Sequence, residues 1–188
     1  MIDYVVNYSP LEELYTHPLQ PKDQDFNCDN FKNIEYQHLS RMNTSRYCKN
    51  IVDIMHSYIA KPLKYQHVFI KIQDLKVGDQ TSGTGHWHLD SSLNPVDYYE
   101  NYIFTTGYHN NTEFFKTPMT ITHAKSSSDF NKQVRMVYDE KRDRFILKPL
   151  TIYRYNGSNV HRGRIVTQPE KRILIRLSNT NVKLTVYK

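Results

Sequence analysis

Short stretches of apolar and polar residues in alternation fill the chain from Tyr65 onward. They are rich in the β-branched and aromatic side chains that favour strands, and Gly, Asn, Asp or Pro separates them. The stretches lie at 67–73, 102–106, 118–122, 145–155, 172–178 and 182–187. Many short strands with few helices between them predict a mainly β protein, either an antiparallel sandwich or a jelly roll.

One segment before these strands has the period of a helix instead. Between Thr44 and Ala60, five apolar residues recur at spacings of three and four. They are Cys48, Ile51, Val52, Met55 and Ile59. Thr44 or Ser45 can cap the start of the segment, and Pro62 stops it. The stripe predicts an amphipathic helix that covers the apolar face of a sheet.

The remaining N-terminal residues read as short helices and loops, because prolines and polar clusters interrupt the first 40 positions. We expect residues 1–62 to pack against the strands of residues 63–188 rather than to form a unit of their own. A chain of 188 residues suits one domain that buries its own core. The sequence therefore predicts a single domain over 1–188.

Cysteine content and the lack of long apolar runs bear on the compartment. Cys28 and Cys48 are too few for a secreted disulfide scaffold and lack CxxC spacing, so we expect two free thiols. No stretch approaches the roughly 20 apolar residues that cross a bilayer, and the N-terminus lacks the basic and apolar segments of a signal peptide. These features predict a soluble, cytoplasmic protein without a membrane partner.

The formal net charge of +6 concentrates anions near the surface. The 15 tyrosines can stack on bases as well as fill a core. The basic residues are nevertheless spread along the chain without a run of five, as on an ordinary solvated surface. A nucleic acid or nucleotide partner stays open, while buried tyrosine is the favoured reason for the aromatic content.

The sharpest local pattern is GHWHLD at residues 85–90, in which potential metal ligands alternate with apolar residues. Side chains two residues apart share one face of a strand, so His88 and Asp90 can bind one ion while Leu89 packs away from it. His86 could add a fourth ligand. We favour a supporting hydrogen bond or a solvent-facing position for it.

A third ligand is expected from a distant turn. His161 fits, because it follows a predicted strand and lies near Gly157 and Gly163, which permit close approach. Two imidazoles and one carboxylate on one face of an octahedral Fe(II) leave three positions open, enough for a bidentate cosubstrate and O₂. The sequence thus predicts His88, Asp90 and His161 as the metal ligands and the catalytic centre.

This pattern resembles the Fe(II)/2-oxoglutarate-dependent dioxygenase superfamily, in which H-x-D is followed by a distant His and then by an Arg. The matching residues here are His88-Leu89-Asp90, His161 and Arg172, and the resemblance covers roughly residues 65–180. It implies a double-stranded β-helix (jelly-roll) core with the N-terminal helices packed on one sheet. It also implies Fe(II) as cofactor and 2-oxoglutarate as cosubstrate, with ascorbate as an optional addition.

The resemblance further implies the reaction. 2-Oxoglutarate would chelate the iron, O₂ would take the last open position, and a substrate C–H bond would be hydroxylated while succinate and CO₂ form. The substrate stays open among small molecules, amino acids and nucleobases. We expect the N-terminal segment and the loops at 74–85, 107–117 and 123–144 to help select it.

Two arginines compete for the far carboxylate of 2-oxoglutarate. Arg172 and Arg176 share one face of a strand, and a guanidinium gives a carboxylate two charge-assisted hydrogen bonds. The offset from His161 favours Arg172, whereas Arg176 with Ser178 forms the R-x-S pattern of part of the superfamily. We place Arg172 first. A tyrosine could also bind the cosubstrate, although core packing is favoured for each candidate: Tyr99, Tyr102, Tyr153 and Tyr155.

Two other classes of protein stay open. In a cupin, also a double-stranded β-helix, an H-x-H pair binds a metal with a later Glu and a distant His. His86, His88 and His161 fit part of that pattern. The first glutamate after the histidine pair is Glu100, however, and its spacing does not match. The second class is a non-enzymatic, basic nucleic-acid-binding module with incidental histidines. Iron binding with oxoglutarate-dependent succinate formation would separate the oxygenase from both.

Overall fold

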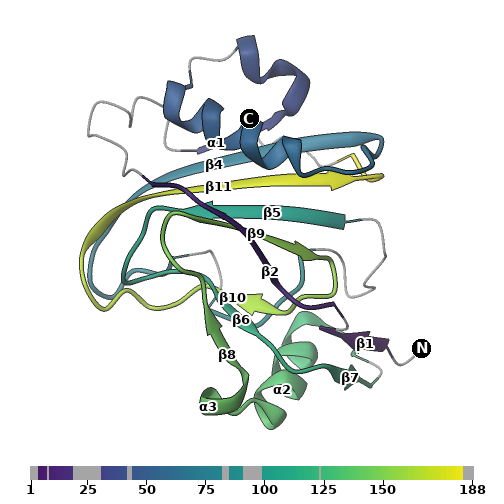
Figure 1. Ribbon diagram of the computed structural model, residues 1–188. Coiled ribbons are helices and arrows are strands. Elements are labelled where there is room, and N and C mark those ends of the chain that lie inside the picture. The colour runs from purple at the N-terminus through teal and green to yellow at the C-terminus, as the bar shows by residue number, and fades with distance from the viewer. Residues whose placement is uncertain are drawn as a thin grey trace.

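The computed structural model describes residues 4–7, 9–18, 31–41, 44–81, 85–90, 99–122 and 124–183. Figure 1 shows a large sheet across the middle of the molecule, with helix α1 on one side of it. A smaller sheet and two short helices lie on the other side. The large sheet therefore separates a helical layer from a second β layer.

Strand β11 (Glu170–Thr180) lies inside a six-stranded antiparallel sheet. It pairs with β4 (Tyr65–Leu75) on one side and with β5 (Tyr99–Thr105) on the other. The full strand order is β2-β9-β5-β11-β4-β3. The edge strands are β2 (Glu12–Thr16) and β3 (Phe31–Glu35), and β9 (Thr151–Asn156) lies between β2 and β5. The predicted mainly β, antiparallel architecture is confirmed.

Alternation along β11 gives the sheet two different faces. Ile173, Ile175 and Leu177 belong to the apolar cluster that also contains the helix residues. Leu174 belongs to a separate cluster with Phe114 on the opposite face. The two arginines of β11 fall on the Leu174 face, as the sequence predicts, and point away from the helical layer.

Helix α1 (Arg46–Ser57) covers the isoleucine face of the sheet. The Ser45 hydroxyl caps it by accepting a hydrogen bond of 3.1 Å from the Cys48 amide. Its buried stripe contains Cys48, Ile51, Val52 and Met55. The short 3-10 helix η2 (Tyr36–Arg41) precedes it. The predicted helix over 44–60 is confirmed, with ends a few residues further in.

The smaller sheet has three antiparallel strands in the order β10-β6-β8. They are β10 (His161–Arg162), β6 (Glu113–Phe115) and β8 (Arg144–Ile146). A further strand pair joins β1 (Tyr4–Val6) to β7 (Met119–Ile121). Helices α2 (Ser127–Val137) and α3 (Glu140–Asp143) follow β7. The serine-rich and charged stretch after residue 125 is thus largely helical.

The two larger sheets meet across a small apolar cluster. Phe114 of β6 packs on Tyr155 of β9 with ring centroids 5.1 Å apart. The same cluster contains Ile103 of β5 and Leu174 of β11. Side chains from both sheets therefore come together in the space between them.

The stretch 145–155, predicted as one strand-forming run, is divided between two sheets. Its first part forms the end of β8 and its last part forms β9. Between them, Pro149 lacks a backbone donor and Leu150 has a φ of 58°, in the left-handed region. The chain turns there, which hydrophobicity alone does not reveal.

Three other predictions have different outcomes. Cys48 is a buried cysteine outside any disulfide, as expected, whereas Cys28 lies outside the described residues. The strand predicted at 182–187 also lies mostly outside them, since β11 ends at Thr180 and the description stops at 183. Within the described ranges, no helix has the length and apolar character needed to span a membrane.

The packing of α1 predicts a difference between two methionines. Met55 is fully buried against the sheet, so Met55→Ala should lower the free energy of unfolding by about 2–5 kcal/mol. Met136 on α2 is 77% exposed, so Met136→Ala should change it by less than about 0.5 kcal/mol. Urea unfolding followed by circular dichroism measures both. Equal effects would show that α1 does not cover the core.

Candidate metal centre

His88 and His161 are joined through their backbones. The His88 amide donates to the His161 carbonyl at 2.9 Å, and the His161 amide donates to the His88 carbonyl at 3.0 Å. In such an antiparallel pair, opposite side chains point to the same side. The two imidazole rings accordingly lie with centroids 4.4 Å apart. The bridge adds the segment 85–90 to the edge of the smaller sheet beside β10.

Asp90 completes a cluster of three potential ligands. Its Oδ1 lies 3.5 Å from His161 Nε2. One ligand atom from each of His88, Asp90 and His161 lies within 4.8 Å of the other two. Trp87 and Leu89, which alternate with the ligands, are buried in a different apolar cluster. The structure thus brings together the three side chains that the sequence singled out.

Hydrogen bonds fix the orientation of both imidazoles. His88 Nδ1 lies 2.9 Å from the His86 carbonyl oxygen, and His161 Nδ1 lies 3.0 Å from the Asn159 carbonyl oxygen. A carbonyl only accepts, so each Nδ1 carries a hydrogen, and Nε2 is the nitrogen that a neutral ring would offer to a metal. Burial, and next the neighbouring His161, lower the pKa of His88, which favours the neutral form that binds metals.

The Asp90 carboxylate also contacts three strands of the large sheet. Its Oδ1 accepts a hydrogen bond of 2.5 Å from Arg176 Nη1 of β11. Its Oδ2 accepts from the Tyr155 hydroxyl of β9 at 2.5 Å and from the Asn101 amide of β5 at 3.4 Å. Burial alone would raise the pKa of Asp90, but Arg176 and His161 hold it well below the usual range. The carboxylate is therefore charged.

The two arginines of β11 have different surroundings. The Arg172 side chain is fully buried, and its Nε and Nη2 both donate to Gln73 Oε1. Its Nη1 donates to the Asn110 carbonyl, and Nη2 also donates to the Thr81 carbonyl. Arg176 instead reaches the ligand cluster. Arg172 thus ties β11 to β4 and to two loops, whereas Arg176 lies at the candidate metal centre.

Sequence reasoning undervalued two side chains of this site. Tyr155 does pack on Phe114, as favoured for a core tyrosine, but its hydroxyl also binds Asp90. Burial and then Asp90 raise the pKa of Tyr155 well above its ordinary value, so the hydroxyl stays a donor. Asn101 was not predicted as a site residue, although it lies two residues before Ile103 on β5 and therefore shares its face. That shared face was the one available signal.

The donor set suits a divalent transition metal. Two imidazole nitrogens with free lone pairs and one charged carboxylate match the two-histidine, one-carboxylate site of non-haem Fe(II) proteins. The hydrogen bonds to each Nδ1 and to Asp90 Oδ2 are the supporting contacts that orient ligands in such sites. His86 lies outside the cluster, its side chain exposed. The residues present therefore fit an Fe(II) site with three protein ligands.

Comparison with known proteins gives little support of its own. No family model matches this chain, and no curated protein does. Among solved structures, it is similar to an oxidoreductase of the 2OG-Fe(II) oxygenase family from Burkholderia pseudomallei, with a TM-score of 0.32 and 17% sequence identity. The match covers 69% of this chain and 50% of that chain, about half of that protein's length. A similarity of this size does not show a family.

The geometry predicts that neighbouring histidines differ in metal binding. His88→Ala should weaken Mn(II) binding by more than about a hundredfold, because loss of even a supporting contact costs about 10–100-fold. His86→Ala keeps the backbone carbonyl that orients His88 and should bind Mn(II) like the wild type. Equilibrium dialysis of both variants, with circular dichroism to verify folding, measures the difference. Equal losses would contradict the ligand assignment.

Proposed function

We propose that this protein is an Fe(II)- and 2-oxoglutarate-dependent oxygenase that hydroxylates a substrate C–H bond. The observation that carries the proposal is the cluster of His88, Asp90 and His161. Both imidazoles bind backbone carbonyls through Nδ1, which leaves Nε2 as the nitrogen that would bind a metal, and the carboxylate is charged. A facial set of this kind leaves room on one metal for both a bidentate cosubstrate and O₂.

The iron and the cosubstrate would supply the oxidative chemistry when bound. One oxygen atom of O₂ would end in succinate and the other in the substrate hydroxyl, with CO₂ released from 2-oxoglutarate. The contribution of the chain is to hold three ligands in place and to surround them. Phe114, with its ring stacked 5.1 Å from that of His161, forms an apolar wall beside the ligands.

Asp90 would bind the metal through Oδ1, the oxygen that faces His161. Tyr155 and Asn101 hold the other oxygen and thereby fix the plane of the carboxylate. Arg176 shares Oδ1 and compensates the charge that burial would otherwise disfavour. The large sheet thus positions a ligand that the loop at 85–90 contributes.

We propose Arg176 as the anchor of the 2-oxoglutarate carboxylate, in place of Arg172. The Nε, Nη1 and Nη2 atoms of Arg172 all donate hydrogen bonds to acceptors within the protein. In Arg176, Nε is buried and has no hydrogen-bond partner among the described residues. A buried donor without a partner is costly, and a carboxylate would satisfy it.

Lys71 of β4 is a further candidate that the sequence did not suggest. It lies directly opposite Leu174 of β11, on the face that carries both arginines. Burial, and next Arg172, lower the pKa of Lys71, as expected of an ammonium group in a positive, partly dry environment. An anion bound on this face of the sheet would find Lys71 as a second cation.

The proposal extends to the fold. We propose that the two facing sheets form the double-stranded β-helix of these oxygenases, and that residues 1–188 make one oxygenase domain. The packing of Phe114 on Tyr155 across the sheets supports this arrangement. The cupin alternative is disfavoured because His86 lies outside the ligand cluster, so its H-x-H pair is not used as one.

The reaction itself can be tested without knowing the substrate. Purified protein supplied with Fe(II), 2-oxoglutarate and O₂ should form succinate slowly, and Asp90→Ala should abolish this because a ligand and its charge are lost. Asp74→Ala, at an exposed position of β4, should leave the rate unchanged. Mass spectrometry of succinate measures all three proteins. Metal binding without any oxoglutarate-dependent succinate would refute the oxygenase.

The two arginines should respond differently to truncation. Arg176→Ala should weaken 2-oxoglutarate binding by about tenfold or more, since hydrogen bonds to charged groups contribute about 1.5–3 kcal/mol. Arg172→Ala should chiefly lower the melting temperature, because several buried acceptors lose their donor. Isothermal titration calorimetry and thermal unfolding separate the two effects. The opposite result would restore Arg172 as the anchor.

A further inference from the structure

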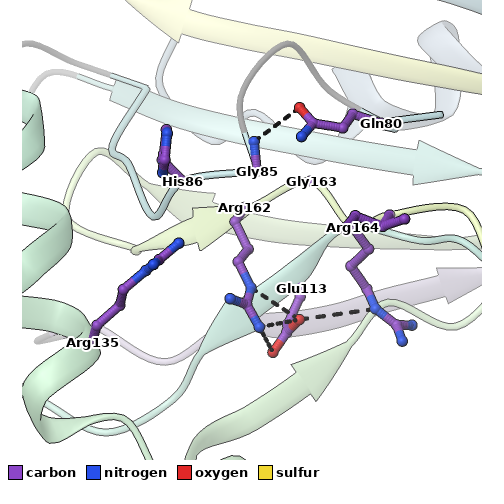
Figure 2. A pocket seen from close by; sticks show the side chains of 9 residues that line it. Gln80, Gly85, His86, Glu113, Arg135, Arg162, Gly163 and Arg164 are labelled. Atoms are coloured by element: carbon purple, nitrogen blue, oxygen red, sulfur yellow. Dashed lines mark hydrogen bonds and ion pairs between the residues drawn. The ribbon is translucent and has the colours of Figure 1, made fainter. Parts of the chain in front are cut away.

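A cavity of about 540 Å³ opens beside the metal centre and is rich in arginine. Arg162 and Arg164 line it from the segment after His161, and Arg135 reaches toward it from α2. The opposite wall comes from Gln80, Gly85 and His86 (Figure 2). Gln80, Gly85, Glu113 and Arg135 lie in the segments expected to help select a substrate.

The cavity lies on the other side of β10 from the metal ligands. His161 stacks on Phe114, whereas the adjacent Arg162 pairs with Glu113, the residue adjacent to Phe114. Neighbouring residues of a strand point to opposite faces, so one two-residue strand separates the two sites. The cavity is therefore distinct from the cluster of ligands.

Positive charge in this cavity exceeds negative charge. Among the described residues that line it, Glu113 is the one acidic side chain, against three arginines. Arg162 forms an ion pair with the Glu113 carboxylate, with Nη2 at 3.1 Å and Nε at 3.2 Å from Oε2. The Tyr138 hydroxyl also donates to Glu113. The charge of Glu113 is thus compensated by Arg162. The other two guanidinium groups of the cavity stay in excess.

Arg164 and Arg135 carry this excess. Arg164 Nε lies 3.9 Å from Glu113, at the outer limit of an ion pair. Burial, then nearby Arg144, lower the pKa of Arg164. Arg144 is itself paired with Glu140. Among the described residues, Arg135 has neither a hydrogen bond nor an ion pair to its side chain.

Contacts within the protein hold Arg162, the Arg164 backbone and Gln80 in place around the cavity. The Arg162 guanidinium lies over the Trp87 ring, 4.3 Å from its centroid. The Arg164 amide donates to Thr81 Oγ1 at 2.9 Å, and the Thr81 amide donates to the Arg164 carbonyl at 3.0 Å. Gln80 accepts from the Gly85 amide at 3.1 Å (Figure 2). The Arg162 guanidinium and the backbone at Arg164 are therefore ordered before a ligand binds, whereas the Arg135 and Arg164 side chains stay available to it.

A second cavity shows that an arginine alone does not give this excess. It measures about 470 Å³ and contains Arg154. Arg154 pairs with Glu12 and lies 3.6 Å from Glu100, and both acids line that cavity. Even with Lys61, its charges balance. The uncompensated positive charge belongs to the cavity of Arg164.

We propose that the cavity of Arg135, Arg162 and Arg164 binds the phosphate group of a small molecule. A phosphate carries nearly two negative charges and several acceptor oxygens, which match two spare guanidinium groups. The cationic side chains converge on one cavity instead of following a track, as a nucleic-acid strand would require. The site does not depend on the proposed oxygenase activity.

Calorimetric titration with inorganic phosphate and with glycerol 3-phosphate tests this site. Both should bind the wild-type protein. Tighter binding of glycerol 3-phosphate would indicate a phosphorylated metabolite as the ligand. Equal or tighter binding of inorganic phosphate would indicate the free ion. Arg164→Gln and Arg135→Gln should each weaken binding by about tenfold or more. Arg154→Gln, in the balanced cavity, should have no effect. His88→Ala should retain binding, which excludes phosphate held by a metal at the ligand cluster.

Three results would overturn the proposal. Absence of measurable phosphate binding to the wild-type protein is the first. Unchanged binding in both arginine variants, verified as folded by circular dichroism, is the second. The third is tighter binding of a single-stranded oligonucleotide than of glycerol 3-phosphate, with a steep salt dependence that indicates many phosphate contacts. Each is independent of whether the protein forms succinate.

Discussion

A charged carboxylate between two sheets constrains the whole site. Asp90 is largely removed from water, and an unpaired charge there would be strongly destabilising. Arg176, Tyr155 and Asn101 each reach it from a different strand of the large sheet, and His161 reaches it from the smaller one. The hydrogen bonds and ion pair of this one side chain therefore hold the 85–90 segment against both sheets. A metal ion would join an existing set of partners.

The two histidines show how little chain is needed to define a metal site. Each imidazole is fixed by a hydrogen bond from Nδ1 to the carbonyl two residues earlier, at His86 and at Asn159. The reciprocal backbone bonds between His88 and His161 then set the spacing of the rings. Local contacts fix orientation and the bridge fixes distance, so the ligand geometry does not depend on long flexible side chains.

Sequence reasoning succeeded where a short-range period decides the outcome. The period of two predicted the shared face of His88 and Asp90 and of the two arginines, and the helical period predicted α1. Alternation puts Arg172 and Arg176 on one face, so the preference for Arg172 rested on its offset from His161 alone. Their distinction comes from partners distant in sequence, such as Gln73. The cavity of guanidinium groups was also not predictable, since its lining residues come from elements far apart in sequence.

Crystallography with a redox-inert ion tests the central claim most directly. Crystals grown with Mn(II) and 2-oxoglutarate would locate the ion by its anomalous scattering. The account predicts one strong peak about 2.0–2.3 Å from Nε2 of His88, Nε2 of His161 and a carboxylate oxygen of Asp90, distances usual for first-row ions. A peak elsewhere, or an ion bound by fewer than these three side chains, would contradict it.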